Sequence, residues 1–446
     1  MPAPAPRSRS RARDLVSATP DTRNRYVDLL RAVSILVVVL GHWLMAVLRF
    51  SDGKFTGSNL LELDPSFQIL TWAFQVMPLF FIVGGFTNAT SWASARERGL
   101  GYAGWLRARS TRLIRPALWF VAFWTVLPVL AVTLGLLPAS VARVGGQEVA
   151  LPLWFLAVYT LTIVALPPLH AVHRRFGART FLGLAVGVFA IDNVRYGLDV
   201  GIVGAANFVF VWLAIVELGF LWRDGVLRSR TWIPWGMAGG GLAVLAVLTL
   251  FFDYPISMID LTHAPRSNAQ PPTLALLALG VWQCGATLIF EDRAERWLRR
   301  SRAWLVVVVA NSMVMTFYLW NMSAVVLAAV LLLPTGIMPA SEPLGAAWWW
   351  LRIAWVAACA ICIAPFLFAF RWAERPAAPP PPSRPGWRGI AVVGAGTAAA
   401  AAGFGLLAVQ AFPVPGEGGF LPWIGVALVA IGAVLVRVDP LVTIQD

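Results

Sequence analysis

The sequence has few charged residues for its length. Of its 446 residues only 13% are Asp, Glu, Lys or Arg, whereas a soluble globular protein carries about 25%. Hydrophobic residues make up 59%, and many apolar runs approach the roughly twenty residues that a helix needs to cross a bilayer. The deficit of charge argues against an ordinary soluble protein and predicts an all-α, polytopic membrane helical bundle.

Cysteine is equally scarce. Cys284, Cys359 and Cys362 all lie in apolar runs, so we expect no disulfide framework. Cys359 and Cys362 have the spacing of a redox or metal pair, but their place in a lipid-spanning segment without a second pair favours side-chain packing. His170 and His173 have no carboxylate or cysteine neighbours in the sequence, and we therefore expect no metal site.

Basic residues indicate how the chain is oriented. Cytoplasmic loops of membrane proteins carry an excess of Lys and Arg. If the N-terminus is cytoplasmic, 28 of the 35 basic residues lie on the inside and five on the outside. The net charge of +13 therefore belongs to the inner loops, which contact the lipid bilayer, and no nucleic-acid partner is expected. We predict a multi-pass protein of the plasma membrane with both termini in the cytoplasm. Its apolar segments lie at about 27–48, 67–90, 113–137, 150–171, 179–197, 201–222, 233–252, 272–290, 304–333, 346–370, 389–409 and 420–438.

Composition divides the chain into four parts. An Arg/Pro-rich cytoplasmic tail covers residues 1–25, and a ten-helix transmembrane core covers residues 26–372. A Pro-rich cytoplasmic linker follows at residues 373–388, where the chain should be extended and semi-rigid. Residues 389–446 hold two accessory transmembrane helices with hardly any polar side chains.

The first apolar segment carries polar residues that a lipid-facing helix would not. Asp28, Arg31 and His42 recur at helical spacing, which places them on one face. A charge at the centre of a membrane helix costs about 2.5–3.5 kcal/mol on insertion scales. We therefore expect this stripe to face a protein-lined cavity, with Asp28 paired to Arg31. The eleven residues from Arg31 to His42 correspond to roughly 16 Å along a helix. A packing or interfacial histidine is the alternative for His42.

The basic stretch before the third segment adds a candidate phosphate site. Arg112 and Arg115 are three residues apart at the predicted start of that segment, with Pro116 as a helix-opening residue. Arginine forks bind phosphate bidentately, so this pair suits a phosphorylated ligand, although topology alone accounts for the other arginines nearby. Asn88 is predicted to line the same cavity and Glu217 to pair with an arginine. Arg352, beside three tryptophans, is predicted to be an interfacial anchor.

Several short motifs resemble those of the acyltransferase 3 family of membrane proteins, in the same order along residues 25–370. Asp28 to Ala32 with His42 resembles the family's first helix. Gly84 stands where the family often has Ser, and Trp320 follows Tyr318-Leu319 where a later His is common. The other matching motifs are Met77 to Phe86, Arg109 to Pro116, Leu153 to Leu156 and Thr316 to Leu319.

The resemblance implies an O-acyltransferase that moves an acyl group, commonly acetyl, from acyl-CoA to a hydroxyl-bearing acceptor. Family acceptors are cell-surface glycans, lipids or glycosylated metabolites, and acyl-CoA is a substrate with no permanently bound cofactor. By this likeness Arg31 and His42 correspond to the family's Arg-x10-His pair, and Arg112 and Arg115 to its Arg-x-x-Arg.

The residue chemistry is compatible with that reaction. The phosphates of CoA call for arginines on the cytoplasmic side, where CoA is found. The pantetheine arm could then carry the thioester past Arg31 toward His42. We expect His42 to act as general base for the acceptor hydroxyl, with an acyl-histidine relay as the less favoured variant. A transporter or flippase for a glycan or lipid intermediate is the competing interpretation.

Overall fold

The computed structural model describes residues 24–198, 200–262, 264–339, 341–375, 386–417 and 419–438. Most of the predicted tail and residues 376–385 of the predicted linker lie outside the described residues.

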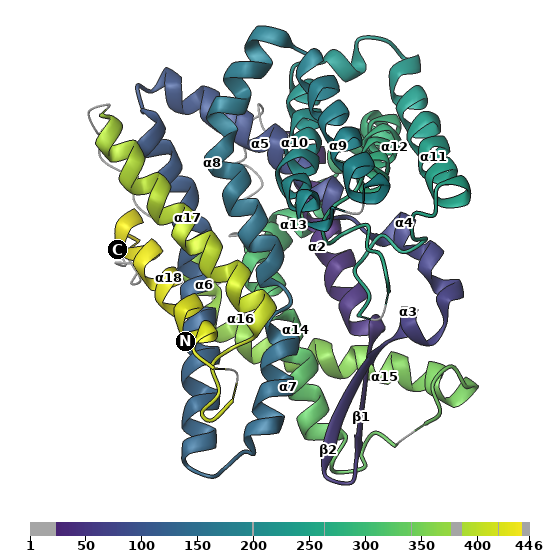
Figure 1. Ribbon diagram of the computed structural model, residues 1–446, viewed down its shortest axis with the longest axis vertical. Helices are drawn as coiled ribbons and strands as arrows, with labels where there is room; N and C mark the ends of the chain where they lie inside the picture. The colour runs from purple at the N-terminus through teal and green to yellow at the C-terminus, as the bar shows by residue number, and fades with distance from the viewer. Residues whose placement is uncertain are drawn as a thin grey trace, which may run out of the picture.

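The described residues form a bundle of helices with one small hairpin (Figure 1). The first half contains α2 (Arg25–Met45), β1 (Ala46–Ser51), β2 (Lys54–Asn59), α3 (Leu60–Leu63), η1 (Pro65–Leu70), α4 (Thr71–Phe74), α5 (Met77–Glu97), α6 (Tyr102–Thr133), α7 (Ala139–Ala150), α8 (Leu153–Phe176), α9 (Arg179–Gly197), η2 (Gly201–Ala206) and α10 (Asn207–Arg223). The second half contains η3 (Val226–Arg228), α11 (Trp232–Phe251), α12 (Leu274–Leu298), α13 (Ser301–Asn311), α14 (Val314–Leu332), α15 (Ala346–Cys362), α16 (Ala364–Phe370), η4 (Arg371–Glu374), α17 (Trp387–Gln410) and α18 (Leu421–Val436).

The predicted all-α membrane bundle is confirmed. Ten helical segments in the described part of the chain are long and apolar enough to cross a membrane. Two of the twelve predicted segments are not among them. The α18 helix has only 16 residues, and α9 carries Asp192, Asn193 and Arg195 in its last turns, which lower its hydropathy.

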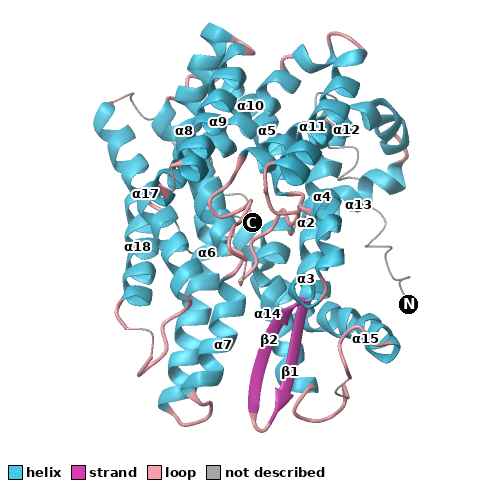
Figure 2. Cartoon of the chain, turned by 45° about the vertical axis from the view of Figure 1, so that its right-hand side comes forward, coloured by secondary structure: helices cyan, strands magenta, loops and turns pink. Residues whose placement is uncertain are grey.

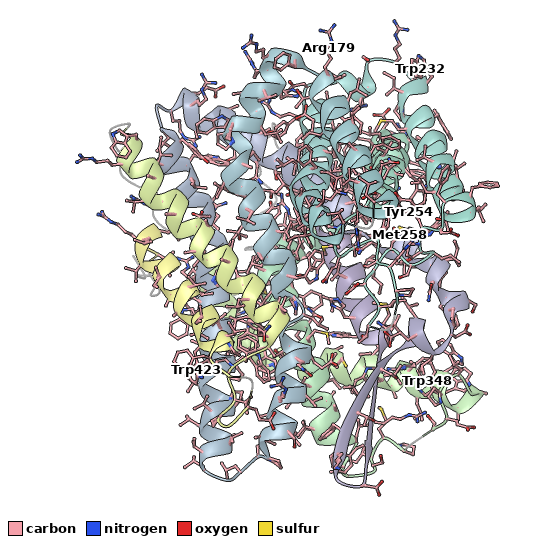
Figure 3. All side chains as sticks on the ribbon, in the orientation of Figure 1. Arg179, Trp232, Tyr254, Met258, Trp348 and Trp423 are labelled. Atoms are coloured by element: carbon pink, nitrogen blue, oxygen red, sulfur yellow. The ribbon has the colours of Figure 1, made fainter. Side chains whose placement is uncertain are left out.

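Three labelled positions follow the predicted alternation of loops, whereas Tyr254 and Met258, from the predicted outer loop between residues 252 and 272, lie midway along the molecule in Figure 3. Figure 3 places Arg179 and Trp232, from two predicted cytoplasmic connections, at one end of the molecule. Trp348, from the predicted outer end of the segment 346–370, lies toward the opposite end. The end that carries Arg179 is therefore the one that the distribution of basic residues assigns to the cytoplasm.

The first helix ends earlier than predicted and turns into a hairpin. The α2 helix stops at Met45, and β1 pairs antiparallel with β2 from Ala46 opposite Asn59 to Ser51 opposite Lys54. The turn residues Asp52 and Gly53 both have positive φ, at 50° and 74°, which is the backbone that an Asp-Gly hairpin turn requires. Figure 2 shows the hairpin at the outer end, close to α15.

Two further helix boundaries correct the predictions. The third transmembrane helix, α6, begins at Tyr102, so Pro116 lies inside it and does not open it. The predicted segment 304–333 is broken into α13 and α14 at Ser312 and Met313. The break is stabilised from outside the segment, because the Glu374 carboxylate accepts hydrogen bonds from the Met315 and Thr316 backbone amides at the start of α14.

The paired glycines of α5 allow close helix packing and do not interrupt the helix. A Cβ added at Gly85 would lie 2.2 Å from the Val216 carbonyl oxygen of α10, and one at Gly219 would lie 2.2 Å from the Ile82 carbonyl oxygen of α5. Only glycine permits this backbone contact, which brings α10 against α5 as small residues do in membrane helix pairs.

The two accessory helices pack on the outside of the core. The α17 helix lies along α8 and α6, and α18 lies on α17 and α6 (Figure 1). The Ser110 and Thr397 hydroxyls are hydrogen-bonded at 2.9 Å between α6 and α17. These helices therefore support α6 and α8 from the side away from α2.

Candidate functional site

His42 lies in the last turn of α2 and is held by a side chain from α14. Its Nδ1 is 3.0 Å from Oδ1 of Asn321. The Asn321 amide group donates from Nδ2 to the Tyr318 carbonyl oxygen, which can only accept, so Oδ1 must face His42. Nδ1 of His42 therefore carries the hydrogen. Nε2 has no hydrogen-bond partner among the described residues and keeps its lone pair.

Neighbouring tryptophans fix this pair in place. The Trp43 indole donates to the Asn321 carbonyl oxygen at 3.0 Å, and the Trp355 indole donates to the Trp43 carbonyl oxygen at 3.0 Å. Tyr318 is itself tied to α8, because its hydroxyl donates to the Pro152 carbonyl oxygen at 2.9 Å. His42 is thus positioned by buried hydrogen bonds from α14 and α15, which is the support that a catalytic imidazole needs.

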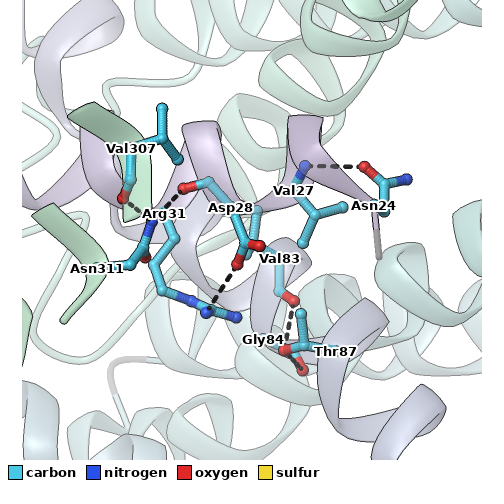
Figure 4. A network of polar contacts seen from close by, with 9 residues as sticks. All are labelled: Asn24, Val27, Asp28, Arg31, Val83, Gly84, Thr87, Val307 and Asn311. Carbon is cyan, nitrogen blue, oxygen red and sulfur yellow. Dashed lines mark hydrogen bonds and ion pairs between the residues drawn. The ribbon is translucent and has the colours of Figure 1, made fainter. Parts of the chain in front are cut away.

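Asp28 and Arg31 form the predicted pair near the cytoplasmic end of the same helix. Nη1 of Arg31 lies 3.3 Å from Oδ1 of Asp28, and the side chains are 25% and 7% exposed. Asn311 of α13 donates to the Asp28 backbone carbonyl at 2.9 Å. Figure 4 shows the pair between Asn311 and the α5 residues Gly84 and Thr87, and α13 and α5 both pack on α2. The ion pair lowers the cost of placing Arg31 in the membrane.

The polar stripe of α2 therefore faces the broken helix formed by α13 and α14. Asn311 of α13 contacts its cytoplasmic end, and Asn321 of α14 contacts its outer end at His42. Broken helices in membrane proteins border functional sites, because their free backbone groups need partners there.

A cluster of arginines faces the cytoplasmic end of this stripe. Arg109 of α6 lies within electrostatic range of Arg31, Arg112 and the Tyr159 hydroxyl. Tyr159 of α8 accepts a hydrogen bond from Nδ2 of the predicted site residue Asn88 at 3.2 Å. Among the described residues, neither Arg109 nor Arg112 has a carboxylate partner. Arg31, Arg109 and Arg112 gather positive charge here, and such charge suits an anionic ligand.

Arg115 is held by backbone carbonyl groups near the end of the core. It is buried, and it donates from Nε to the Ala373 carbonyl oxygen at 2.8 Å and from Nη2 to that of Arg375. Arg112, by contrast, is exposed on α6. Arg109, which has the same three-residue spacing from Arg112, is the arginine that interacts electrostatically with both Arg112 and Arg31, while the donor-site role of Arg112 and Arg115 stays a prediction. The sequence contains both pairs, and spacing alone does not distinguish them.

Glu217 is placed differently from the prediction. It is fully buried, and its carboxylate accepts from Nδ1 of His173 and forms no ion pair with an arginine among the described residues. Nε2 of His173 lies 3.1 Å from Asp224. His173 thus has two carboxylate neighbours that its sequence surroundings did not reveal, because both come from α10 and its C-terminal end. No group of three His, Cys, Asp or Glu residues within the described ranges could hold a metal.

The Tyr159 ring accounts for the absence of a side chain at residue 84. A Cβ at Gly84 would lie 2.9 Å from the Tyr159 ring, so the tyrosine occupies the space of a side chain at this position. The departure from the expected Ser at residue 84 therefore accompanies a ring that reaches the arginine cluster and Asn88.

Comparison with known families agrees with this arrangement. The profile of the acyltransferase 3 family, described as an acyltransferase domain, matches residues 24–370 and so includes α2, the arginine cluster and the broken helix. No curated protein and no solved structure matches the chain at a significant level. Because the family match covers most of the chain and the described helices form a membrane bundle, the protein belongs to the acyltransferase 3 family and is a multi-pass membrane acyltransferase.

Proposed function

We propose that the protein is an O-acyltransferase of the plasma membrane that moves an acetyl group from cytoplasmic acetyl-CoA to an acceptor hydroxyl. The acceptor is a glycan, a lipid or a glycosylated metabolite at or beyond the outer leaflet. The observation that carries the proposal is the hydrogen bond from Nδ1 of His42 to Asn321, because it leaves Nε2 ready to accept a proton.

The donor side of the proposal rests on the arginine cluster. CoA carries a 3′-phosphate and a pyrophosphate, and Arg109, Arg112 and Arg31 provide cationic groups near one another. The thioester lies at the far end of the pantetheine arm from the phosphates. It would extend along α2 from Arg31 toward His42, a rise of roughly 16 Å for eleven residues.

The reaction at His42 is a single displacement. Nε2 accepts the proton of the acceptor hydroxyl while the hydroxyl oxygen attacks the thioester carbonyl carbon. The new C–O bond forms, the C–S bond breaks, and the CoA thiolate leaves and receives the proton from the imidazolium. A positioned general base contributes about 10²–10⁴-fold in rate.

The test uses purified protein in nanodiscs with labelled acetyl-CoA and an added glycan and lipid extract that supplies acceptor hydroxyls. We expect thioester turnover in the wild type and a loss of about 10²–10⁴-fold in His42→Ala. Equal turnover in both would refute the role of His42. If the protein bound no CoA, and Arg109→Gln and Arg112→Gln had no effect, the transporter interpretation would replace this one.

A further inference from the structure

A cavity of about 400 Å³ lies on the outer side of His42. It is lined by the start of the hairpin, by the segment before α15 and by α15 itself, and Trp348 marks its position in Figure 3. The volume is within the range of about 300–1,000 Å³ that small-molecule sites occupy. We define the outer pocket by Val47, Arg49, Trp348, Arg352 and Trp355, which are among the residues that line it.

Arg352, in the wall of this pocket, forms no ion pair with a carboxylate among the described residues. It is only 7% exposed, although we predicted an interfacial anchor. Its Nη1 donates to the Ala46 carbonyl oxygen at 2.7 Å, and its guanidinium lies 4.3 Å from the centre of the Trp348 ring. Its Nε is buried without a partner, and among the described residues no carboxylate forms an ion pair with it. A buried cation that lacks its counter-charge marks a binding site for an anion.

The remaining lining residues extend the charge and add aromatic surface. Arg49 brings a second cation to the pocket, and Glu342 is the single carboxylate that lines it. The buried rings of Trp348 and Trp355 provide flat apolar walls. Sugar rings pack their C–H faces on indole, while cations bind phosphate or carboxylate groups.

The pocket is connected to His42 by consecutive contacts. Trp355 in the pocket wall donates to the Trp43 carbonyl oxygen, Trp43 donates to that of Asn321, and Asn321 accepts from His42. Arg352 also binds the carbonyl oxygen of Ala46, the residue that ends α2 one turn after His42. A ligand in the pocket therefore lies next to the last turn of the helix that carries the imidazole.

We infer that the outer pocket binds the acyl acceptor, and that this acceptor is a sugar carrying an anionic group, a phosphate or a carboxylate. The inference rests on the proposed function and narrows its substrate class. The guanidinium of Arg352 binds the anionic group, the tryptophans pack on the ring, and a hydroxyl of the sugar is directed toward Nε2 of His42.

The experiment measures ligand binding by saturation-transfer NMR in nanodiscs of neutral phosphatidylcholine. The probes are glucose, glucose 6-phosphate and glucuronate. We expect both anionic sugars to bind the wild type at least tenfold more tightly than glucose. Arg352→Gln should remove this preference and Arg49→Gln should weaken it. Arg143→Gln is the matched control, because Arg143 is also on the outer side but pairs with Glu417 at 3.7 Å, away from the pocket.

Two results in neutral nanodiscs would overturn the inference, and a third would come from anionic nanodiscs. One is equal binding of glucose and the anionic sugars by the wild type. The other is that Arg352→Gln and Arg49→Gln both bind the anionic sugars as tightly as the wild type does. Because Arg49 is exposed, replacing it should leave the fold intact. The same binding measurements are repeated in nanodiscs that contain one-fifth anionic phosphatidylglycerol. If this lipid displaces the sugars, the pocket binds lipid headgroups and the inference is wrong.

Turnover of acetyl-CoA by the same preparations separates this inference from the proposed function. Wild-type protein that binds anionic sugars but does not consume acetyl-CoA would refute the proposed function while the binding site stands. Wild-type protein that consumes acetyl-CoA but binds none of the sugars would refute the pocket assignment alone.

Discussion

Replacing Asn321 with leucine tests the hydrogen bond that sets the state of His42. Leucine has a similar volume but no acceptor, so Nδ1 of His42 loses its partner at 3.0 Å and the ring can turn or exchange its tautomer. Leaving a buried donor unpaired costs about 1–3 kcal/mol. If this cost raises the activation free energy by the same amount, kcat falls by a factor of about 5 to 150.

The assay is the release of CoA from labelled acetyl-CoA at saturating donor. Asn321→Leu should fall between the wild type and His42→Ala, which loses about 10²–10⁴-fold. Asn321→Asp retains an acceptor for Nδ1 but cannot donate to Tyr318, so its activity should exceed that of the leucine variant.

Ser323→Ala is the matched control. Ser323 is also fully buried on α14 and accepts one hydrogen bond, from the Trp124 indole at 2.9 Å, but does not contact His42. A wild-type kcat in folded Asn321→Leu would refute the positioning role. So would an equal loss in Ser323→Ala, since a general effect of removing polar groups from α14 would then explain both.

Three further substitutions test other parts of the site. Arg109→Gln should raise KM for acetyl-CoA about tenfold with little change in kcat, as expected for a phosphate contact made throughout the reaction; an unchanged KM would remove Arg109 from the donor site. Arg115→Met should lower stability by about 1–3 kcal/mol for each carbonyl left unpaired, measured by thermal unfolding, while KM stays constant; a raised KM at full stability would instead support the donor-site role of Arg115. Gly84→Ala should cost about 1–3 kcal/mol by forcing the Tyr159 ring to move, and Tyr159→Leu in the same chain should recover it; no loss in the single variant would contradict the close contact.

The membrane bundle could be predicted because apolar runs and loop charges follow directly from the cost of burying polar groups in lipid. The hairpin had a local signal as well, since Asp52-Gly53 between Phe50 and Phe55 is a typical turn sequence, but it was masked by the apolar run that precedes it. The break between α13 and α14 had no local signal. It depends on Glu374, which is about sixty residues away in the chain and accepts hydrogen bonds from the start of α14.

Part of the candidate site could be predicted because polar groups in a membrane helix avoid lipid. Helical spacing placed Asp28, Arg31 and His42 on one face, and this face does meet the broken helix. Spacing could not identify Asn321 as the partner of His42, because the two residues are brought together only by the packing of α2 on α14. It also could not choose between Arg109 and Arg115, whose surroundings are set by α8 and η4.

The contacts around α2 place cationic groups near both of its ends. Its cytoplasmic end lies beside Arg109 and Arg112, and its outer end is joined to Arg352 through Ala46. None of these three arginines forms an ion pair with a carboxylate in the described part of the chain. Cationic groups therefore lie on both sides of His42, although membrane helices avoid charge. Two anionic ligands, one from each side, account for this arrangement better than one ligand that crosses the bilayer, because a transported anion would have to leave each cationic site in turn. In the proposed reaction the phosphates of CoA stay at one end of α2 and the anionic group of the acceptor stays at the other. Only the acyl group passes between them, at Nε2 of His42. Each cationic site then has its own anionic ligand.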